Sequence, residues 1–370
     1  MTGPVPARPT AGALTGYFLR LGSLGFGGPI ALVGAMQRDL VDERGWFSRD
    51  EFGKSLALAQ LAPGPLAAQV AFCLGFLHSR LRGAALVGLA FILPSFVLTL
   101  LLGVLYAGYG GLPWLGAAFY GVGAVVLGII VVSAWRLARA TARADPLLWS
   151  LTAVVAVVTA WRAEELLWLI GLAGLVGLLA ALSPRPRPGT TLSLALLPQL
   201  LWYFAKAGTF VFGSGLAIVP FLYAGVVTEH RWLTERQFLD AIAVAMLTPG
   251  PVVITAAFIG FLVAGVPGAV AGTVGVFLPA FVLAVILLPV LDRWAGNPLV
   301  TGFMRGVTSA AAGAIAGACV VLGRRSIQDV PTAVLALVAL GVSARSRIPS
   351  GLIVLAGAAA GLLLGAGYHR

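Results

Sequence analysis

Long apolar runs alternate along the chain with short charged segments. The run from Gly83 to Tyr106 contains no ionisable residue except its tyrosine. About 20 consecutive apolar residues cross the hydrocarbon core of a bilayer as a helix, and these runs lack the polar–apolar alternation of a membrane β-barrel. The pattern predicts an all-α polytopic membrane protein.

Composition supports this prediction. Of the 370 residues, 59% are hydrophobic and 10% are charged, whereas a soluble domain carries about 25% charged residues. The net charge of +11 comes largely from arginines that flank the apolar runs, as expected of residues that orient membrane helices. No basic soluble segment interleaved with aromatic residues indicates nucleic-acid binding. Cys73 and Cys319 fall inside apolar runs and are expected to be small buried hydrophobes.

The sequence contains an internal repeat. A shift of 186 places Phe26-Gly27 on Phe212-Gly213 and Pro63-Gly64-Pro65 on Pro249-Gly250-Pro251. After a one-residue gap the shift becomes 185 and pairs Pro94 with Pro279. We therefore predict two homologous helical repeats, each with about five to six membrane segments. The predicted boundaries are a polar tail (1–11), a first repeat (12–182), a Pro/Arg linker (183–197) and a second repeat (198–370).

Loop charges favour an inverted arrangement of the two repeats. The segment from His78 to Arg82 is basic, and its counterpart from Val263 to Pro267 is uncharged. The following pair of loops reverses this bias, which favours opposite orientations. Arg324 and Arg325, however, match a basic cluster at 136–143, which favours a parallel arrangement.

Glycine and proline interrupt apolar segments at equivalent positions of both repeats. Pro ends a helix, and the helix that restarts after it presents free N–H groups and a positive dipole end that bind anions. Paired breaks of this kind are typical of a transporter site near the membrane midplane; the alternative is a kink for packing. The candidate substrate-binding residues at the breaks are Phe26, Gly27, Gly28, Pro29, Pro63, Gly64, Pro65, Phe212, Gly213, Ser214, Gly215, Pro249, Gly250 and Pro251.

Four polar residues near the breaks are further candidates. Arg20 and Lys206 occupy one repeat position before the glycine breaks, where they could add to an anion-binding field or extend to the membrane interface. Gln60 and Thr248 precede the Pro-Gly-Pro sequences and could donate to oxyanion oxygens, or form ordinary bonds between helices.

Charged segments at the predicted membrane edges repeat as well. Glu43 and Glu229 each precede a tryptophan and are candidates for coupling or gating, with a surface ion pair as the alternative. Ser48 and Thr234 are predicted N-caps, each with Glu or Gln three residues later, as in a capping box. Asp145 and Asp329 are also expected to cap helices.

Enzymatic signatures are missing from the sequence. It contains no His-Glu-x-x-His, no paired aspartates within apolar runs and no Gly-x-x-x-x-Gly-Lys-Ser/Thr. We expect no catalytic residue, no metal site and no cofactor. Transport must then be driven by gradients or by another subunit.

The order of motifs resembles the chromate transporter (CHR) family in its long, two-domain form. The resemblance rests on Phe-Gly-Gly-Pro, Glu-x-x-Trp-(Phe/Leu)-(Ser/Thr), Pro-Gly-Pro and Leu-Pro-x-Phe, and it extends from about Ala11 to about Leu364. It implies an inner-membrane protein that exports chromate, a sulfate analogue, and confers chromate resistance. The second repeat departs from the pattern, with Gly213-Ser214-Gly215 and no Pro.

Alternating access with helix-end anion binding is the mechanism that the resemblance implies. A carrier for sulfate or another oxyanion, and a passive anion channel, remain alternatives. The expected partners are a chromate- or sulfate-type oxyanion and membrane lipids, with a homodimer left open and no nucleic acid.

Overall fold

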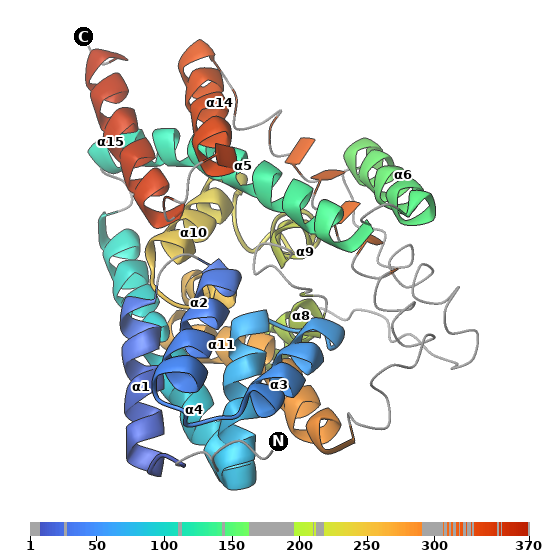
Figure 1. Ribbon diagram of the computed structural model, residues 1–370. Helices are drawn as coiled ribbons and strands as arrows, with labels where there is room; N and C mark the ends of the chain where they lie inside the picture. The colour runs from blue at the N-terminus through green and yellow to red at the C-terminus, as the bar shows by residue number, and fades with distance from the viewer. Residues whose placement is uncertain are drawn as a thin grey trace.

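The computed structural model describes residues 8–25, 28–109, 113–142, 145–162, 196–209, 211 and 218–290. Beyond these it describes 306, 309–310, 312–313, 316–317, 319–320, 323, 327, 329–345, 348 and 350–368. The secondary structure of this part of the chain is entirely helical (Figure 1). Three stretches, Leu66–Gly108, Ala117–Ala142 and Val252–Leu287, are long and apolar enough to cross a membrane. The prediction of an all-α membrane protein is confirmed.

The described helices follow the repeat. Helix α1 (Ala11–Leu24) matches α8 (Leu196–Thr209), and α3 (Arg49–Leu61) matches α10 (Glu235–Leu247) residue for residue under the shift of 186. Two six-residue π-helical turns, η1 (Arg38–Glu43) and η3 (Ala224–Glu229), also match. They follow α2 (Gly28–Gln37) and α9 (Val219–Tyr223) respectively.

Each repeat then forms a helical hairpin. Helix α4 (Leu66–Tyr109) reverses at Ser79 and Arg80. Its counterpart, the short η4 (Val252–Ile254) with α11 (Thr255–Leu287), reverses at Ala264 and Gly265. The matched residues Arg80 and Gly265 have φ of 53° and 60°. The two arms of α4 pack so closely that a Cβ at Gly75 would lie 2.5 Å from the Gly83 carbonyl oxygen. The segment predicted as a basic loop is therefore a tight turn.

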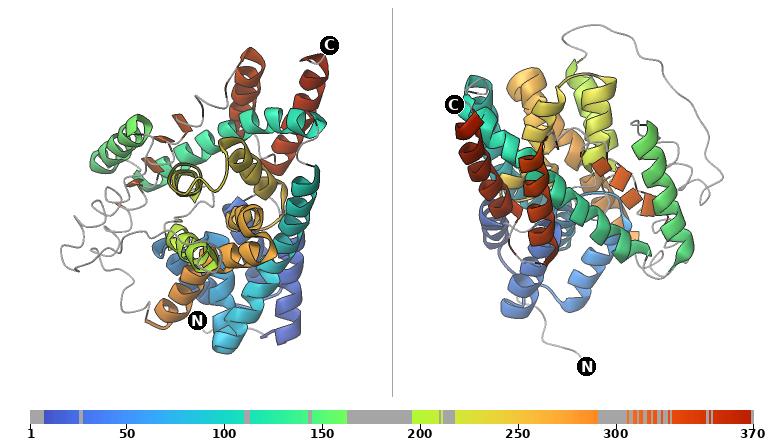
Figure 2. Two further views of the ribbon diagram at one scale, coloured as in Figure 1. Left: turned by 180° about the vertical axis from the view of Figure 1, so that it is seen from behind. Right: turned by 90° about the horizontal axis from the view of Figure 1, so that it is seen from above.

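The two hairpins pack against each other and against the helices that precede them. Helix α1 packs on α4, α8 packs on α11, and α4 and α11 pack on each other. Phe72 of α4 and Phe281 of α11 meet edge to face at 5.4 Å between ring centroids. Figures 1 and 2 show α14 (Val330–Arg345) and α15 (Ser350–Tyr368) against α5 (Pro113–Ala142), with α6 (Pro146–Arg162) at the periphery. The 3₁₀ turn η5 (Leu288–Val290) ends the second hairpin.

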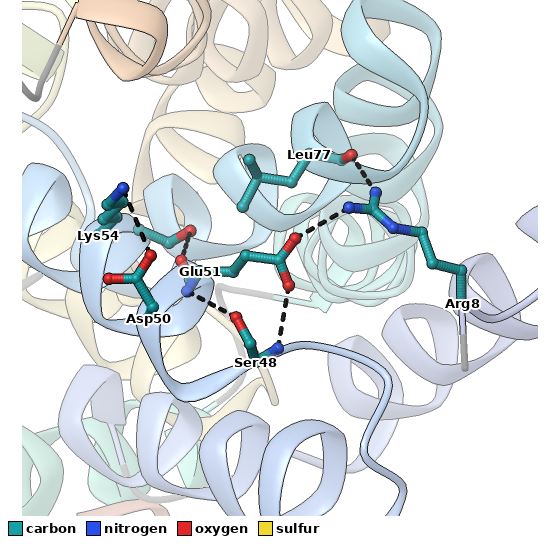
Figure 3. Close-up of polar contacts among 7 residues, drawn as sticks. Arg8, Ser48, Asp50, Glu51, Lys54 and Leu77 are labelled. Atoms are coloured by element: carbon teal, nitrogen blue, oxygen red, sulfur yellow. Dashed lines mark hydrogen bonds and ion pairs between the residues drawn. The ribbon is translucent and has the colours of Figure 1, made fainter. Parts of the chain in front are cut away.

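The predicted helix caps are confirmed. Ser48 and Glu51 form a capping box at the start of α3, and Thr234 and Gln237 form the matched box at the start of α10. In the first repeat Arg8 binds both the Glu51 carboxylate and the Leu77 carbonyl, and so ties the N-terminal segment to α3 and α4 (Figure 3).

Asp145 and Asp329 cap helices too. Asp145 accepts from the Leu147 amide at the start of α6. Asp329 accepts from the Thr332 amide at the start of α14.

Candidate anion site at matched helix breaks

The Pro-Gly-Pro turns lie between two helical segments in each repeat. The first turn separates α3 from α4, and the second separates α10 from η4. Gly64 and Gly250 have φ of 143° and 92°, values that side chains other than glycine rarely adopt. Both glycines are also enclosed: a Cβ at Gly64 would lie 2.7 Å from Ala280 Cβ, and one at Gly250 would lie 2.1 Å from Ser95 Oγ. Each of the two positions therefore requires glycine, both because of its backbone φ and because no space remains for a Cβ.

Each turn closes on the opposite repeat. The Gly64 amide donates to the Val211 carbonyl at 2.6 Å, and the Gly250 amide donates to the Gly25 carbonyl at 2.9 Å. Val211 and Gly25 are themselves equivalent under the shift of 186, so the two bonds are reciprocal. Gly25 and Val211 directly precede the glycine breaks at Phe26-Gly27 and at Phe212-Gly213. Each Pro-Gly-Pro turn is therefore bonded to the residue that precedes the glycine break of the opposite repeat.

The first proline carbonyl of each turn is also bonded. Gln69 Nε2 donates to the Pro63 oxygen at 2.8 Å, whereas Ser95 Oγ donates to the Pro249 oxygen at 2.6 Å. Gln69 belongs to the same repeat as its turn, but Ser95 belongs to the opposite one. A helix-ending carbonyl buried without a partner is costly, and both donors prevent that cost.

Two buried polar atoms on α4, the helix that supplies both carbonyl donors, lack a partner within the described part of the chain. They are Gln69 Oε1 and Thr99 Oγ1. Thr99 lies one helical turn after Ser95 on α4, and its side chain is fully buried. An unsatisfied hydroxyl in such a place is a candidate hydrogen-bond donor for a bound ion or water. The sequence prediction missed Gln69, Ser95 and Thr99, although a four-residue spacing of hydroxyls within an apolar helix is a readable signal.

The structure places the other predicted residues as follows. Arg20, Lys206 and Gln60 are exposed on α1, α8 and α3. Thr248 is buried, and its hydroxyl donates to the Ala245 carbonyl of its own helix. Gly28 and Pro29 begin α2. The remaining break residues lie outside the described residues: Phe26, Gly27, Phe212, Gly213, Ser214 and Gly215.

Comparison with known proteins gives the family. The family model described as Chromate transporter matches residues 12–178 and again 198–362, one match for each repeat. The chain belongs to the chromate transporter family. It is therefore a multi-pass membrane transporter and not an enzyme.

Relatives of this family member cover almost its whole length. A protein of Synechococcus elongatus named Probable chromate transport protein is 51% identical over 95% of this chain and 94% of its own. The Chromate transport protein of Cupriavidus metallidurans is 49% identical over 93% and 90%. That of Pseudomonas aeruginosa is 33% identical over 90% and 85%. No solved structure matches the chain.

A cluster of aromatic rings around a basic residue occurs at the same position of each repeat in this transporter. In the first, the Arg44 guanidinium lies over the rings of Tyr17 and Trp46, 5.4 Å and 4.7 Å from their centroids. In the second, the matched His230 stacks on Trp232 at 4.4 Å and meets the Tyr203 ring edge-on. Burial lowers the pKa of His230; the charge of Lys206 adds to this and that of Glu229 opposes it.

The predicted gating carboxylates lie beside these clusters and are exposed. Glu43 lies 3.9 Å from Arg38, with 63% of its side chain exposed. Glu229 is exposed next to His230. The position of Glu43 agrees with the surface ion-pair alternative, whereas Glu229 is exposed without an ion pair among the described residues. The described residues contain no cluster of three or more His, Cys, Asp or Glu side chains that could hold a metal ion.

Proposed function

We propose that this transporter carries chromate, or a sulfate-like oxyanion, across the cytoplasmic membrane by alternating access. The names of the relatives support the substrate. The observation that carries the mechanism is the reciprocal pair of hydrogen bonds between each Pro-Gly-Pro turn and the residue before the glycine break of the opposite repeat, Val211 or Gly25. A site built from both repeats changes its access whenever one repeat moves against the other.

Backbone amides are the principal anion donors in this proposal. Helix α4 begins at Leu66 and η4 begins at Val252, each directly after a turn, and the first residues of α4 are buried. The first amides of a helix have no partner within it and carry the positive end of the dipole. A dianion taken from water needs such compensation, because burial of an uncompensated charge is prohibitive. The Thr99 hydroxyl is a side-chain donor in the same region.

Arg20 and Lys206 have a longer-range role in the proposal. Their exposure places them on the outer faces of α1 and α8, away from the buried turns. We propose that they attract the anion toward the breaks, and that export of chromate by this route confers resistance.

Flux in proteoliposomes tests the proposal. Labelled chromate is offered outside, with unlabelled chromate, sulfate or phosphate inside. A carrier shows faster tracer entry when substrate is present on the opposite side, and a passive channel does not. Faster entry with chromate or sulfate supports the proposal; entry that ignores the internal anion overturns alternating access. Faster entry with phosphate alone overturns the substrate class.

A matched pair of variants tests the site. Thr99→Val removes the unpartnered hydroxyl, and Thr273→Val removes a hydroxyl that already donates to the Ala269 carbonyl of its own helix. We expect Thr99→Val to raise the half-saturating chromate concentration by about tenfold, the effect of a hydrogen bond to a charged group, and Thr273→Val to leave it unchanged. Equal effects of the two variants contradict a role for Thr99.

In the double variant Arg20→Ala/Lys206→Ala we expect a lower flux at low salt, and an unchanged flux contradicts the role of these cations.

A further inference from the structure

One buried carboxyl group connects the repeats at a point that the anion site does not use. Asp240 of α10 is 3% exposed and is the only acidic or basic residue that is buried in the described part of the chain. Its Oδ2 accepts a hydrogen bond from the Tyr106 hydroxyl of α4 at 2.6 Å. The contact therefore joins the second repeat to the first through side chains.

Aromatic rings enclose this contact. The Tyr106 ring meets Phe119 of α5 and Phe258 of α11 edge to face, at 5.7 Å and 5.5 Å between centroids. Four helices, α4, α5, α10 and α11, thus converge around one carboxyl group. A carboxylate in such an apolar setting is disfavoured relative to the neutral acid.

Few other charges act on Asp240. Arg236 lies one turn earlier on the same helix and is the one full charge that influences its ionisation. Among the packed elements, α11 contains no ionisable residue, and the only one in α15 is Tyr368. In α5, Tyr120 donates to Asp329 and Arg136 donates to the Ser343 carbonyl; Arg139 is the remaining ionisable residue.

The smaller neighbouring elements add little. Tyr223 of α9 donates to Glu235, and Glu229 of η3 is exposed. The charged residues of α4, His78 to Arg82, lie around its hairpin turn. Burial raises the pKa of Asp240 to about 6, and the Tyr106 hydrogen bond and Arg236 partly oppose that shift. Burial and the single neighbouring charge therefore favour the neutral form of this carboxyl group more than an exposed site would.

The matched position in the first repeat shows that the fold does not need this carboxyl group. Position 240 corresponds to Lys54 under the shift of 186. Lys54 points outward on α3, 44% exposed, and pairs with Asp50 at 3.3 Å (Figure 3). Helix α3 folds in the same way as α10 with an exposed lysine at this position, so the buried acid is a special feature of the second repeat.

We propose that Asp240 is the proton-binding site that couples oxyanion transport to a proton gradient, with Tyr106 as its positioning residue. The proposal rests on the proposed function. Asp240 lies eight residues before Thr248 on α10, about 12 Å along the helix axis, and the Pro249-Gly250-Pro251 turn follows directly.

The coupling follows from the different costs of burying the two forms. The neutral acid tolerates the contact with Tyr106, whereas the carboxylate favours a conformation in which α10 moves off α4 and water reaches the side chain. The same movement displaces the second turn, which is bonded to the Gly25 carbonyl. One proton binds to a carboxylate oxygen from one side of the membrane and leaves to the other side, and the oxyanion itself is chemically unchanged.

The decisive variant is Asp240→Asn in proteoliposomes with chromate. Asn can still accept from Tyr106 but cannot bind a proton. Two quantities are measured: exchange of labelled for unlabelled chromate at equal pH, and net chromate transport driven by an imposed pH gradient. We expect exchange to persist while gradient-driven transport falls by about tenfold or more, because the titrating group is lost. Asp50→Asn removes an exposed carboxylate from the matched helix α3 and should leave both quantities unchanged.

Other outcomes separate this proposal from the proposed function. Normal gradient-driven transport in Asp240→Asn shows that the contact is only structural and overturns the proposal. Wild-type exchange that ignores an imposed gradient also overturns it, but leaves the carrier function intact. Wild-type protein that shows no exchange overturns the proposed function itself.

Two further variants keep the proposal testable if Asp240→Asn fails to fold. Asp240→Glu retains a titratable group and should retain gradient-driven transport; its complete loss, with exchange intact, overturns the proposal. Tyr106→Phe removes the hydrogen bond that lowers the pKa of Asp240, so the pH at half-maximal transport should rise. A pH profile identical to that of the wild type contradicts the role of Tyr106.

Discussion

The two Pro-Gly-Pro turns share one backbone conformation but take their side-chain partners from different places. Both glycines have positive φ, and both amides donate to the opposite repeat. The Pro63 carbonyl is bonded by Gln69 of its own repeat, whereas the Pro249 carbonyl is bonded by Ser95 of the other. The residues matched to these donors, Thr255 and Ala280, do not take the same role: Thr255 donates to the Val252 carbonyl.

This difference has a mechanical consequence. A movement of one repeat against the other leaves the Gln69 bond intact and breaks the Ser95 bond. The Pro63 carbonyl thus keeps its partner when the repeats move, while the Pro249 carbonyl keeps its partner only in the packed arrangement of the two repeats. Asp240 adds to the same asymmetry, since its bond to Tyr106 also crosses between the repeats. Both side-chain bonds from the first repeat therefore end on the segment of the second repeat that contains α10 and its turn.

The largest effect on stability is expected from substitution of the glycine in each of the two turns. Gly64→Ala and Gly250→Ala each impose an unfavourable φ and a steric overlap, with contacts of 2.7 Å and 2.1 Å from the added Cβ. Together these cost about 3 kcal/mol or more. We expect both variants to lower the unfolding midpoint in detergent strongly and equally, because the backbone requirement is the same. As a control, Gly53→Ala on α3 meets no atom within 4 Å and should not destabilise the protein. A Gly250→Ala variant as stable as the wild type contradicts the conformational argument.

Exchanging the partners of the two proline carbonyls should have a smaller effect. Gln69→Leu leaves the buried Pro63 carbonyl unpaired and should lower the free energy of unfolding by about 1–3 kcal/mol. Ala280 lies against Gly64 as Ser95 lies against Gly250, so Ala280→Ser supplies a hydroxyl from the opposite repeat. We expect the double variant Gln69→Leu/Ala280→Ser to recover about half of the loss.

The recovery is the informative part of that experiment. Denaturation of the single and double variants measures it, and Ala280→Ser alone is the control. If the double variant is no more stable than Gln69→Leu, the two turns do not accept the same donor geometry. The two proline carbonyls are then not interchangeable as hydrogen-bond acceptors.

Local rules made much of the fold predictable from the sequence. The capping boxes at Ser48 and Thr234 depend on residues three apart, and the helix ends at Pro63 and Pro249 depend on proline chemistry. The repeat identified which breaks are equivalent. It could not show what each Pro-Gly-Pro turn contacts, because the bond from Gly64 to Val211 joins residues that are distant in sequence.

For the candidate site, it was harder to predict which side chains point inward and which point outward. The buried face of α1 contains Leu14, Tyr17, Phe18 and Gly22, and Arg20 lies two residues from Phe18, about 200° around the helix. Its apolar neighbours in sequence left open a cation beside the anion site or one that extends to the membrane interface, whereas helical periodicity places it outward. Asp240 was missed for the opposite reason. It ends a charged segment that was interpreted as surface, although the apolar run Ala241 to Leu247 follows it directly.

The smallest expected effect distinguishes the two aromatic clusters by their response to pH. The first cluster contains a guanidinium, a group that does not titrate in proteins, whereas burial lowers the pKa of His230 in the second cluster from its ordinary 6.5. The unfolded chain therefore binds a proton more readily, so the stability contributed by neutral His230 is complete above pH 6.5 and declines as the pH falls below it.

His230→Phe keeps a ring against Trp232 without a titratable group. We expect the melting temperature of this variant to fall less than that of the wild type on acidification, whereas Arg44→Phe should leave the pH dependence unchanged. The raised pKa of Asp240 contributes with the opposite sign in all three proteins, so the difference between each variant and the wild type is the quantity to compare. If His230→Phe and the wild type lose stability in parallel below pH 6.5, His230 does not give the second cluster a pH response that the first lacks.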